Sequence, residues 1–161
     1  MAGRFPKQID LFARHPDFEL VNEQSEIAPV PLGEDISSLS AIVLDEGYYD
    51  FIGKNVLVVD GIPLTRALSV IPLKMPAHID LNRRHAAGEH VSEKDLRKHR
   101  TDICRLVDLL PSEARLPLEG PMREDAVAFL DDFSVCAKRE TSAKKRRALA
   151  KVDEIIRQTY L

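Results

Sequence analysis

The apolar residues of this chain change their spacing near Pro63. Before Pro63, short runs rich in β-branched residues, such as residues 55–59, alternate with turn-forming stretches, which is typical of strands. After Pro63, apolar residues recur every three or four positions, which is the spacing of amphipathic helices. We therefore predict an α+β fold for the 161 residues. Residues 1–63 would form a small, partial β-sheet lobe, and residues 64–161 an all-helical lobe of about four helices.

The first lobe is expected to contain strands joined by irregular segments. The second of these strands tolerates Pro29 only as an edge strand. Asp60-Gly61 is a turn signal directly after the fourth strand. The predicted strands cover residues 8–12, 27–30, 39–44 and 55–59, and a short helix covers residues 45–52.

The second lobe carries clear helix boundaries. Gly88 is suited to end one helix, and Ser92 to cap the next with Asp95 three residues later. Pro72 and Pro76 predict a break between a short helix and a longer one, or a kink near Pro76. The predicted helices cover residues 64–70, 73–87, 93–110, 121–139 and 142–160. Their predicted apolar positions include Leu96, Ile103, Leu106, Val107, Leu110, Val127, Leu130, Val135, Leu149, Val152, Ile155 and Ile156.

Composition predicts a soluble, cytoplasmic protein. The chain is 44% hydrophobic and 30% charged, close to globular averages, and no apolar run approaches the roughly 18 residues of a membrane helix. The first residues lack a signal-peptide core. The net charge of −3 argues against a general nucleic-acid coat, although residues 71–161 are mildly basic. Cys104 and Cys136 are predicted to be reduced, largely buried thiols in helices.

The usual catalytic motifs are missing from the sequence. It contains no G-x-x-x-x-G-K-S/T, no G-x-G-x-x-G and no G-x-S-x-G. His85, Glu89 and His90 invite a zinc hypothesis, but Gly88 interrupts the helix between the first ligand and the others. A polar loop between helices is the favoured interpretation of these three residues.

A few charged residues stay as candidates for chemistry. Asp10 lies between two apolar residues on a predicted strand, which is how divalent-metal carboxylates are often held. Lys74 and Asp102 lie on successive helices that a short loop would bring together. They would form either a structural ion pair or part of a phosphate-facing pocket. The run 144–147, Lys-Lys-Arg-Arg, is either a solvated helix face or a phosphate contact.

Several segments, taken in order, resemble a bacterial family of nucleotidyltransferase-like proteins. This family is similar to the type IV abortive-infection toxins of toxin–antitoxin systems, in the polymerase-β-like superfamily. The resemblance runs from about Ile9 to Leu110. It is carried by residues 34–45, Tyr48-Tyr49, 58–62, 71–74, 80–81, 88–89 and 98–106.

The resemblance implies Mg²⁺-dependent transfer of a nucleoside monophosphate by complete family members. In the superfamily, three carboxylates hold two metal ions, and Asp10 matches only the third of them. The resemblance assigns Lys74 and Asp102 to the nucleotide cleft, with Lys98 and Arg100 as further nucleotide-binding candidates. Because the Gly-Ser and D-x-D motifs are missing from the sequence, we expect this chain to be inactive alone.

An alternative is a catalytically empty, standalone module that binds a protein or a nucleic-acid partner. Under the first hypothesis, the expected ligands are Mg²⁺ and a nucleoside triphosphate, with a nucleotide or RNA as substrate. No membrane partner is expected under either hypothesis. The acceptor substrate and the oligomeric state stay open.

Overall fold

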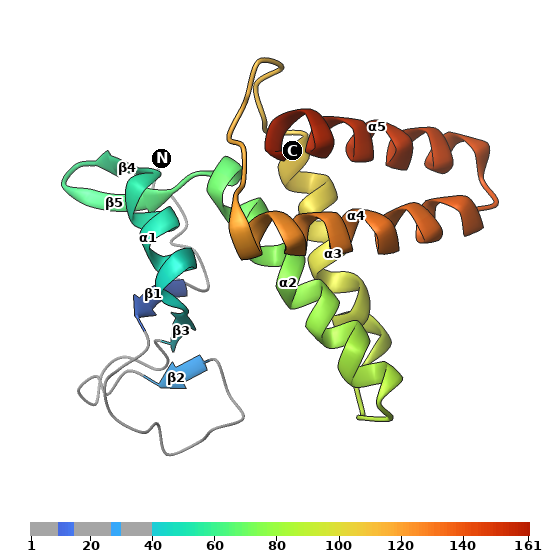
Figure 1. Cartoon of the computed structure of the whole chain (residues 1–161), viewed down its shortest axis with the longest axis horizontal. Helices are drawn as coiled ribbons and strands as arrows, with labels where there is room; N and C mark the ends of the chain where they lie inside the picture. Colours follow the sequence, from blue (N-terminus) through green and yellow to red (C-terminus); the bar gives the residue numbers. More distant parts are fainter. Residues whose placement is uncertain (1–9, 15–26, 30–39) are drawn as a thin grey trace, which may run out of the picture. The chain divides into compact units, whose positions relative to one another are not determined.

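The computed structural model of the chain describes residues 10–14, 27–29 and 40–161. These residues form five short strands and five helices, so the α+β prediction, with its lobe of four consecutive helices, is confirmed. The chain divides into two compact units, residues 1–54 and residues 55–161 (Figure 1). None of the helices in the described ranges is long and apolar enough to cross a membrane.

The described residues of the first unit form a three-stranded mixed sheet and one helix. β3 (Ser40–Leu44) is the central strand, with β1 (Asp10–Arg14) parallel to it on one side and β2 (Ile27–Pro29) antiparallel on the other. β2 is therefore an edge strand, as its proline predicts. β1 lies two residues later than expected, and the predicted residues 8–9 fall outside the described part.

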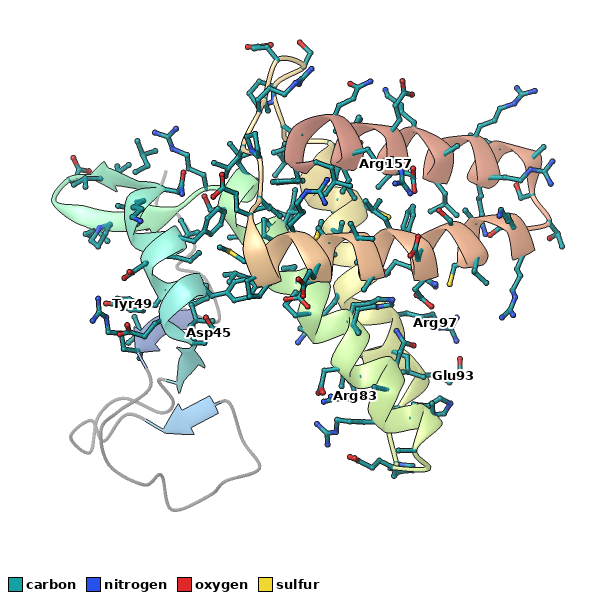
Figure 2. The ribbon with its side chains drawn as sticks, viewed as in Figure 1. Asp45, Tyr49, Arg83, Glu93, Arg97 and Arg157 are labelled. Atoms are coloured by element: carbon teal, nitrogen blue, oxygen red, sulfur yellow. The ribbon has the colours of Figure 1, made fainter. Side chains whose placement is uncertain are left out.

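The helix of this unit, α1 (Glu46–Lys54), begins at a side-chain cap. The Asp45 carboxylate accepts a hydrogen bond of 2.9 Å from the N–H of Tyr48, which satisfies one of the free donors of the first turn. Arg14 of β1 then joins the strand to the helix. Its guanidinium lies 3.2 Å from Asp50 and 4.9 Å from the ring centroid of Tyr49 (Figure 2).

The second unit opens with a hairpin of β4 (Val56–Val59) and β5 (Ile62–Thr65). Its two-residue turn holds Asp60 at φ 52° and Gly61 at φ 80°, and a type I′ turn needs positive values at both positions. The predicted helix over residues 64–70 is wrong at its start, because Leu64 pairs with Leu57 as a strand residue. The predicted boundary between residues 63 and 64 lies inside β5.

α2 (Ala67–Ala86) is one continuous helix that contains Pro72 and Pro76, so the predicted break between residues 70 and 73 is wrong. Pro72 has no N–H, and the carbonyl oxygen of Leu68 therefore loses its usual helical donor. The hydroxyl of Tyr160 donates to this oxygen at 2.8 Å. A residue from the far end of the chain thus replaces one hydrogen bond that the proline removes.

The turn between α2 and α3 (Glu93–Val107) follows the predicted signals. Gly88 has φ 87°, and its N–H and that of the following residue bond carbonyl oxygens of the last turn of α2, at 3.0 Å each. This is a Schellman motif. Ser92 caps α3 by accepting a 3.1 Å hydrogen bond from the N–H of Asp95. The capped C-terminus of α2 and the capped N-terminus of α3 are joined by a short turn, so the two helices pack side by side (Figure 1).

α4 (Gly120–Arg139) and α5 (Ala143–Tyr160) lie side by side across the α2–α3 pair (Figure 1). Their ends match the predicted ones to within a residue. Val127 and Val135, predicted as apolar contacts of α4, are exposed, and Phe129 and Phe133 occupy the core in their place. The core of the unit consists of Ile71, Met75, Ile103, Val107, Leu118, Ala126, Phe129, Leu130, Phe133, Val152, Ile156 and Tyr160.

Candidate functional site

An ion pair joins α2 to α3. Lys74 Nζ lies 3.1 Å from Asp102 Oδ2, and the two side chains are 24% and 29% exposed. The short, doubly capped turn explains the meeting, because it sets the two helices against each other. The structure therefore brings these two predicted site residues together. Lys74 lies in the middle of α2. Because both side chains are partly exposed, a ligand could compete for the charge of either residue.

His99 lies beside this pair and was missed by the sequence analysis. Burial, assisted by the positive charges of Lys74 and Lys98 and opposed by Asp102, lowers the pKa of its imidazole to about 4. Its Nδ1 is buried and has no hydrogen-bond partner among the described residues. A signal was available in the sequence, because His99 follows Leu96 by three residues and lies on the same apolar stripe of α3.

A cavity of about 280 Å³ opens next to His99, near the turn between α2 and α3. Lys98 lines this cavity and makes no ion pair with any described residue. Arg84 also lines it and pairs with Glu89 at 2.7 Å. The complete lining is Leu81, Arg84, His90, Val91, Asp95, Lys98 and His99. Its two cations and the neutral imidazole of His99 suit an anionic group such as a phosphate, and Asp95 is the one carboxylate in the lining.

Arg100, the third predicted nucleotide-binding cation, lies elsewhere. It lines a second depression together with Phe133, Cys136 and Lys145, on the side of α3 that faces α4 and α5. Residues two apart on a helix do not share a face, so Lys98 and Arg100 cannot both point at one small ligand. The structure thus groups Lys74, Lys98 and Asp102 around His99 and separates Arg100 from them.

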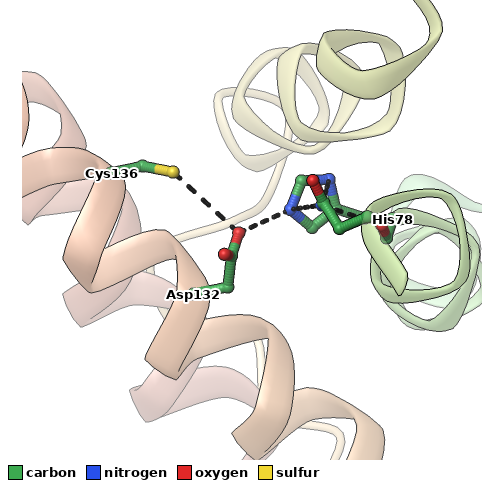
Figure 3. A network of polar contacts seen from close by, with 4 residues as sticks. His78, Asp132 and Cys136 are labelled. Atoms are coloured by element: carbon green, nitrogen blue, oxygen red, sulfur yellow. Dashed lines mark hydrogen bonds and ion pairs between the residues drawn. The ribbon is translucent and has the colours of Figure 1, made fainter. Parts of the chain in front are cut away.

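A second polar network joins α2 to α4 (Figure 3). His78 is 2% exposed, and its Nε2 lies 2.8 Å from Asp132 Oδ2. Asn82 contacts the same imidazole from one turn further along α2. Cys136 Sγ lies 3.9 Å from the carboxylate of Asp132 rather than beside the imidazole (Figure 3). Because the carboxylate of Asp132 lies between the imidazole and the thiol, His78 cannot activate Cys136 as a nucleophile. The network therefore joins the two helices.

The predicted metal site depends on Asp10. Asp10 begins β1, but its side chain lies outside the described residues. Among the side chains that the structure describes, those of residues 11–14 and 44–161, no three His, Cys, Asp or Glu residues are placed to hold a metal ion.

Both cysteines are free and half-buried. Burial raises the pKa of the Cys104 thiol, which makes it a poor nucleophile near neutral pH. Neither cysteine therefore extends the candidate site.

A comparison of the chain with protein-family models, curated proteins and solved structures found no match.

Proposed function

We propose that the helical unit binds the phosphates of a nucleotide, as part of a nucleotidyltransferase-like protein that needs further carboxylates for transfer. The single observation that carries this proposal is the half-buried pair of Lys74 and Asp102 on adjacent helices. The family resemblance assigns these same two positions to the nucleotide cleft. The cavity beside His99 adds Lys98, a cation that forms no ion pair with a described residue.

Neutral His99 strengthens this proposal. An uncharged imidazole with a free Nδ1 serves as a hydrogen-bond donor or acceptor, whereas a charged one would repel Lys74 and Lys98. In the proposed arrangement Lys98 contacts a phosphate directly, and Asp102 orients Lys74. Asp10 would supply one metal ligand in a complete site, and Mg²⁺ would be held only together with further carboxylates.

The test is calorimetric titration of the chain with each Mg²⁺-bound nucleoside triphosphate in turn. Lys98→Ala is expected to weaken binding about tenfold or more, because a charge-assisted hydrogen bond contributes roughly 1.5–3 kcal/mol. Lys94→Ala is the matched control, since Lys94 is exposed on the same helix and does not line the cavity. Absence of binding for every nucleotide, or equal losses in both variants, would contradict the proposal.

A charge swap separates the two roles of the Lys74–Asp102 pair. The double variant Lys74→Asp, Asp102→Lys keeps an ion pair between α2 and α3 but moves the cation to the other helix. A purely structural pair predicts unchanged nucleotide binding in this variant. The proposed role predicts that thermal stability largely recovers relative to either single variant, whereas nucleotide affinity does not.

A second candidate function is nucleic-acid binding by α5. Residues 144–147 lie at the start of this helix, where the helix dipole disfavours cations. All four side chains are exposed, and none makes an ion pair with a described residue. Such an arrangement is unfavourable for folding and favourable for contacting phosphates. The expected result is RNA binding that weakens with salt, with a logarithmic slope of about −3 for four contacts to a single strand. A flat salt response would exclude it.

A further inference from the structure

The β4–β5 hairpin exposes an apolar face. Because Leu57 pairs with Leu64 and Val59 with Ile62, these four side chains lie on the same face. Their exposed fractions run from 42% to 60%. An isolated two-stranded hairpin is only marginally stable in water, and four exposed aliphatic side chains on one face are unusual for a monomer. The hairpin therefore has the properties of a sheet fragment that further structure extends or covers.

The two edges of the hairpin are not equivalent. Pro63 lies opposite Val58 and has no N–H, so this pair is a non-hydrogen-bonded one, with backbone groups that point away from the partner strand. The outer edge of β5 therefore lacks a donor at Pro63, which discourages pairing there. The outer edge of β4 keeps the N–H and C=O of both Val56 and Val58. Among the described residues, β5 is the only strand that pairs with β4.

This edge of β4 is complementary to itself. In an antiparallel pairing centred on Leu57, Val56 of one copy lies opposite Val58 of the other, and both residues point their backbone groups at the partner. The register needs no bulge or shift. The two Leu57 side chains then meet on the two-fold axis, on the apolar face.

The charges around the hairpin favour the same arrangement. Exposed Asp60 lies at the turn end, and exposed Arg66 directly follows β5 at the open end. Neither makes an ion pair with a described residue. Antiparallel pairing brings the turn end of one hairpin to the open end of the other, so Asp60 of one copy and Arg66 of its partner lie at the same end of the sheet, about two strand spacings or roughly 10 Å apart. We propose that two copies of this chain associate through β4 and form a continuous four-stranded antiparallel sheet.

The test is analytical ultracentrifugation of the full chain over a range of concentrations. Leu57→Lys places two like charges opposite each other on the two-fold axis and is expected to raise the dimer dissociation constant about tenfold or more. Leu64→Lys is the matched control, because it lies on the same face with similar exposure but one strand away from the axis. It is expected to leave the dimer largely intact.

A cross-linking measurement tests the same interface without relying on the lysine variants, which could lose the dimer because they misfold. Leu57→Cys is expected to form a disulfide-linked dimer under mild oxidation, since non-hydrogen-bonded antiparallel pairs bring Cα atoms to about 4.5 Å, within disulfide range. Leu64→Cys, which keeps the same native cysteines, is expected not to cross-link. A monomer at every concentration, or equal cross-linking of both variants, would overturn the proposal.

Discussion

The hydroxyl of Tyr160 donates a 2.8 Å hydrogen bond to the carbonyl oxygen of Leu68. That oxygen lost its helical donor to Pro72, and Tyr160 is fully buried, which raises the pKa of its hydroxyl and keeps it a donor. The last helix thus holds the first turns of α2 in place across 92 residues of sequence.

Removing this hydroxyl is expected to cost stability in a way that depends on Pro72. Tyr160→Phe should lower the free energy of unfolding by about 1 kcal/mol, because the Leu68 carbonyl then has no donor. In a Pro72→Ala background the cost should be smaller, since the new N–H bonds the same oxygen. Urea denaturation of the four proteins in this cycle measures the difference. The same cost in both backgrounds would contradict the explanation.

Acid should destabilise the chain through His99. The pKa of His99 is about 4 in the folded chain against about 6.5 in an unfolded one, so protons bind the unfolded chain more readily. The contribution of neutral His99 to stability is complete above pH 6.5 and is lost as the pH falls towards 4. His99→Gln should flatten this part of the stability–pH curve, measured by urea denaturation at several pH values. His85→Gln, at an exposed position on α2, should leave the slope unchanged.

The contact between His78 and Asp132 should contribute more to the stability of the fold than the exposed neighbouring position on α4. Asp132→Ala removes the carboxylate from a buried imidazole and is expected to lower the free energy of unfolding by about 1–3 kcal/mol. Asp131→Ala, at the exposed neighbouring position, should change it by no more than about 0.5 kcal/mol. Thermal melts of both variants give the comparison. Equal effects would show that the buried contact contributes nothing specific.

Substitution of Gly88 should lower the stability of the unit because the backbone of this residue has a positive φ. Its φ of 87° lies in the left-handed region, although a Cβ at this position would meet no atom within 4 Å. Gly88→Ala is therefore expected to destabilise the unit by about 1 kcal/mol through conformation alone. Gly88→Asn should cost less, because asparagine tolerates this region better. Chemical denaturation distinguishes the two, and equal costs would contradict a conformational origin.

Local chemistry in the sequence was enough to predict much of the fold. Asp60-Gly61 predicted a turn after the fourth strand, and both residues have the positive φ that a type I′ turn needs. Gly88 predicted a helix end and Ser92 a helix start, and both are confirmed. These signals involve residues within one turn of each other, so their energetics do not depend on the rest of the chain. With both ends of the loop known, the meeting of Lys74 and Asp102 could also be anticipated.

By itself, then, the sequence determined the fold class, most element boundaries and the loop that brings Lys74 to Asp102. Only the tertiary structure decided that α2 continues through its prolines and that Leu64 joins a strand. It also revealed the partner of His78, because Asp132 lies 54 residues away. In each case the physical reason is the same. The local sequence around a proline, a short apolar run or a buried imidazole is compatible with more than one conformation or hydrogen-bond partner. A contact with residues distant in the sequence decides which of them forms.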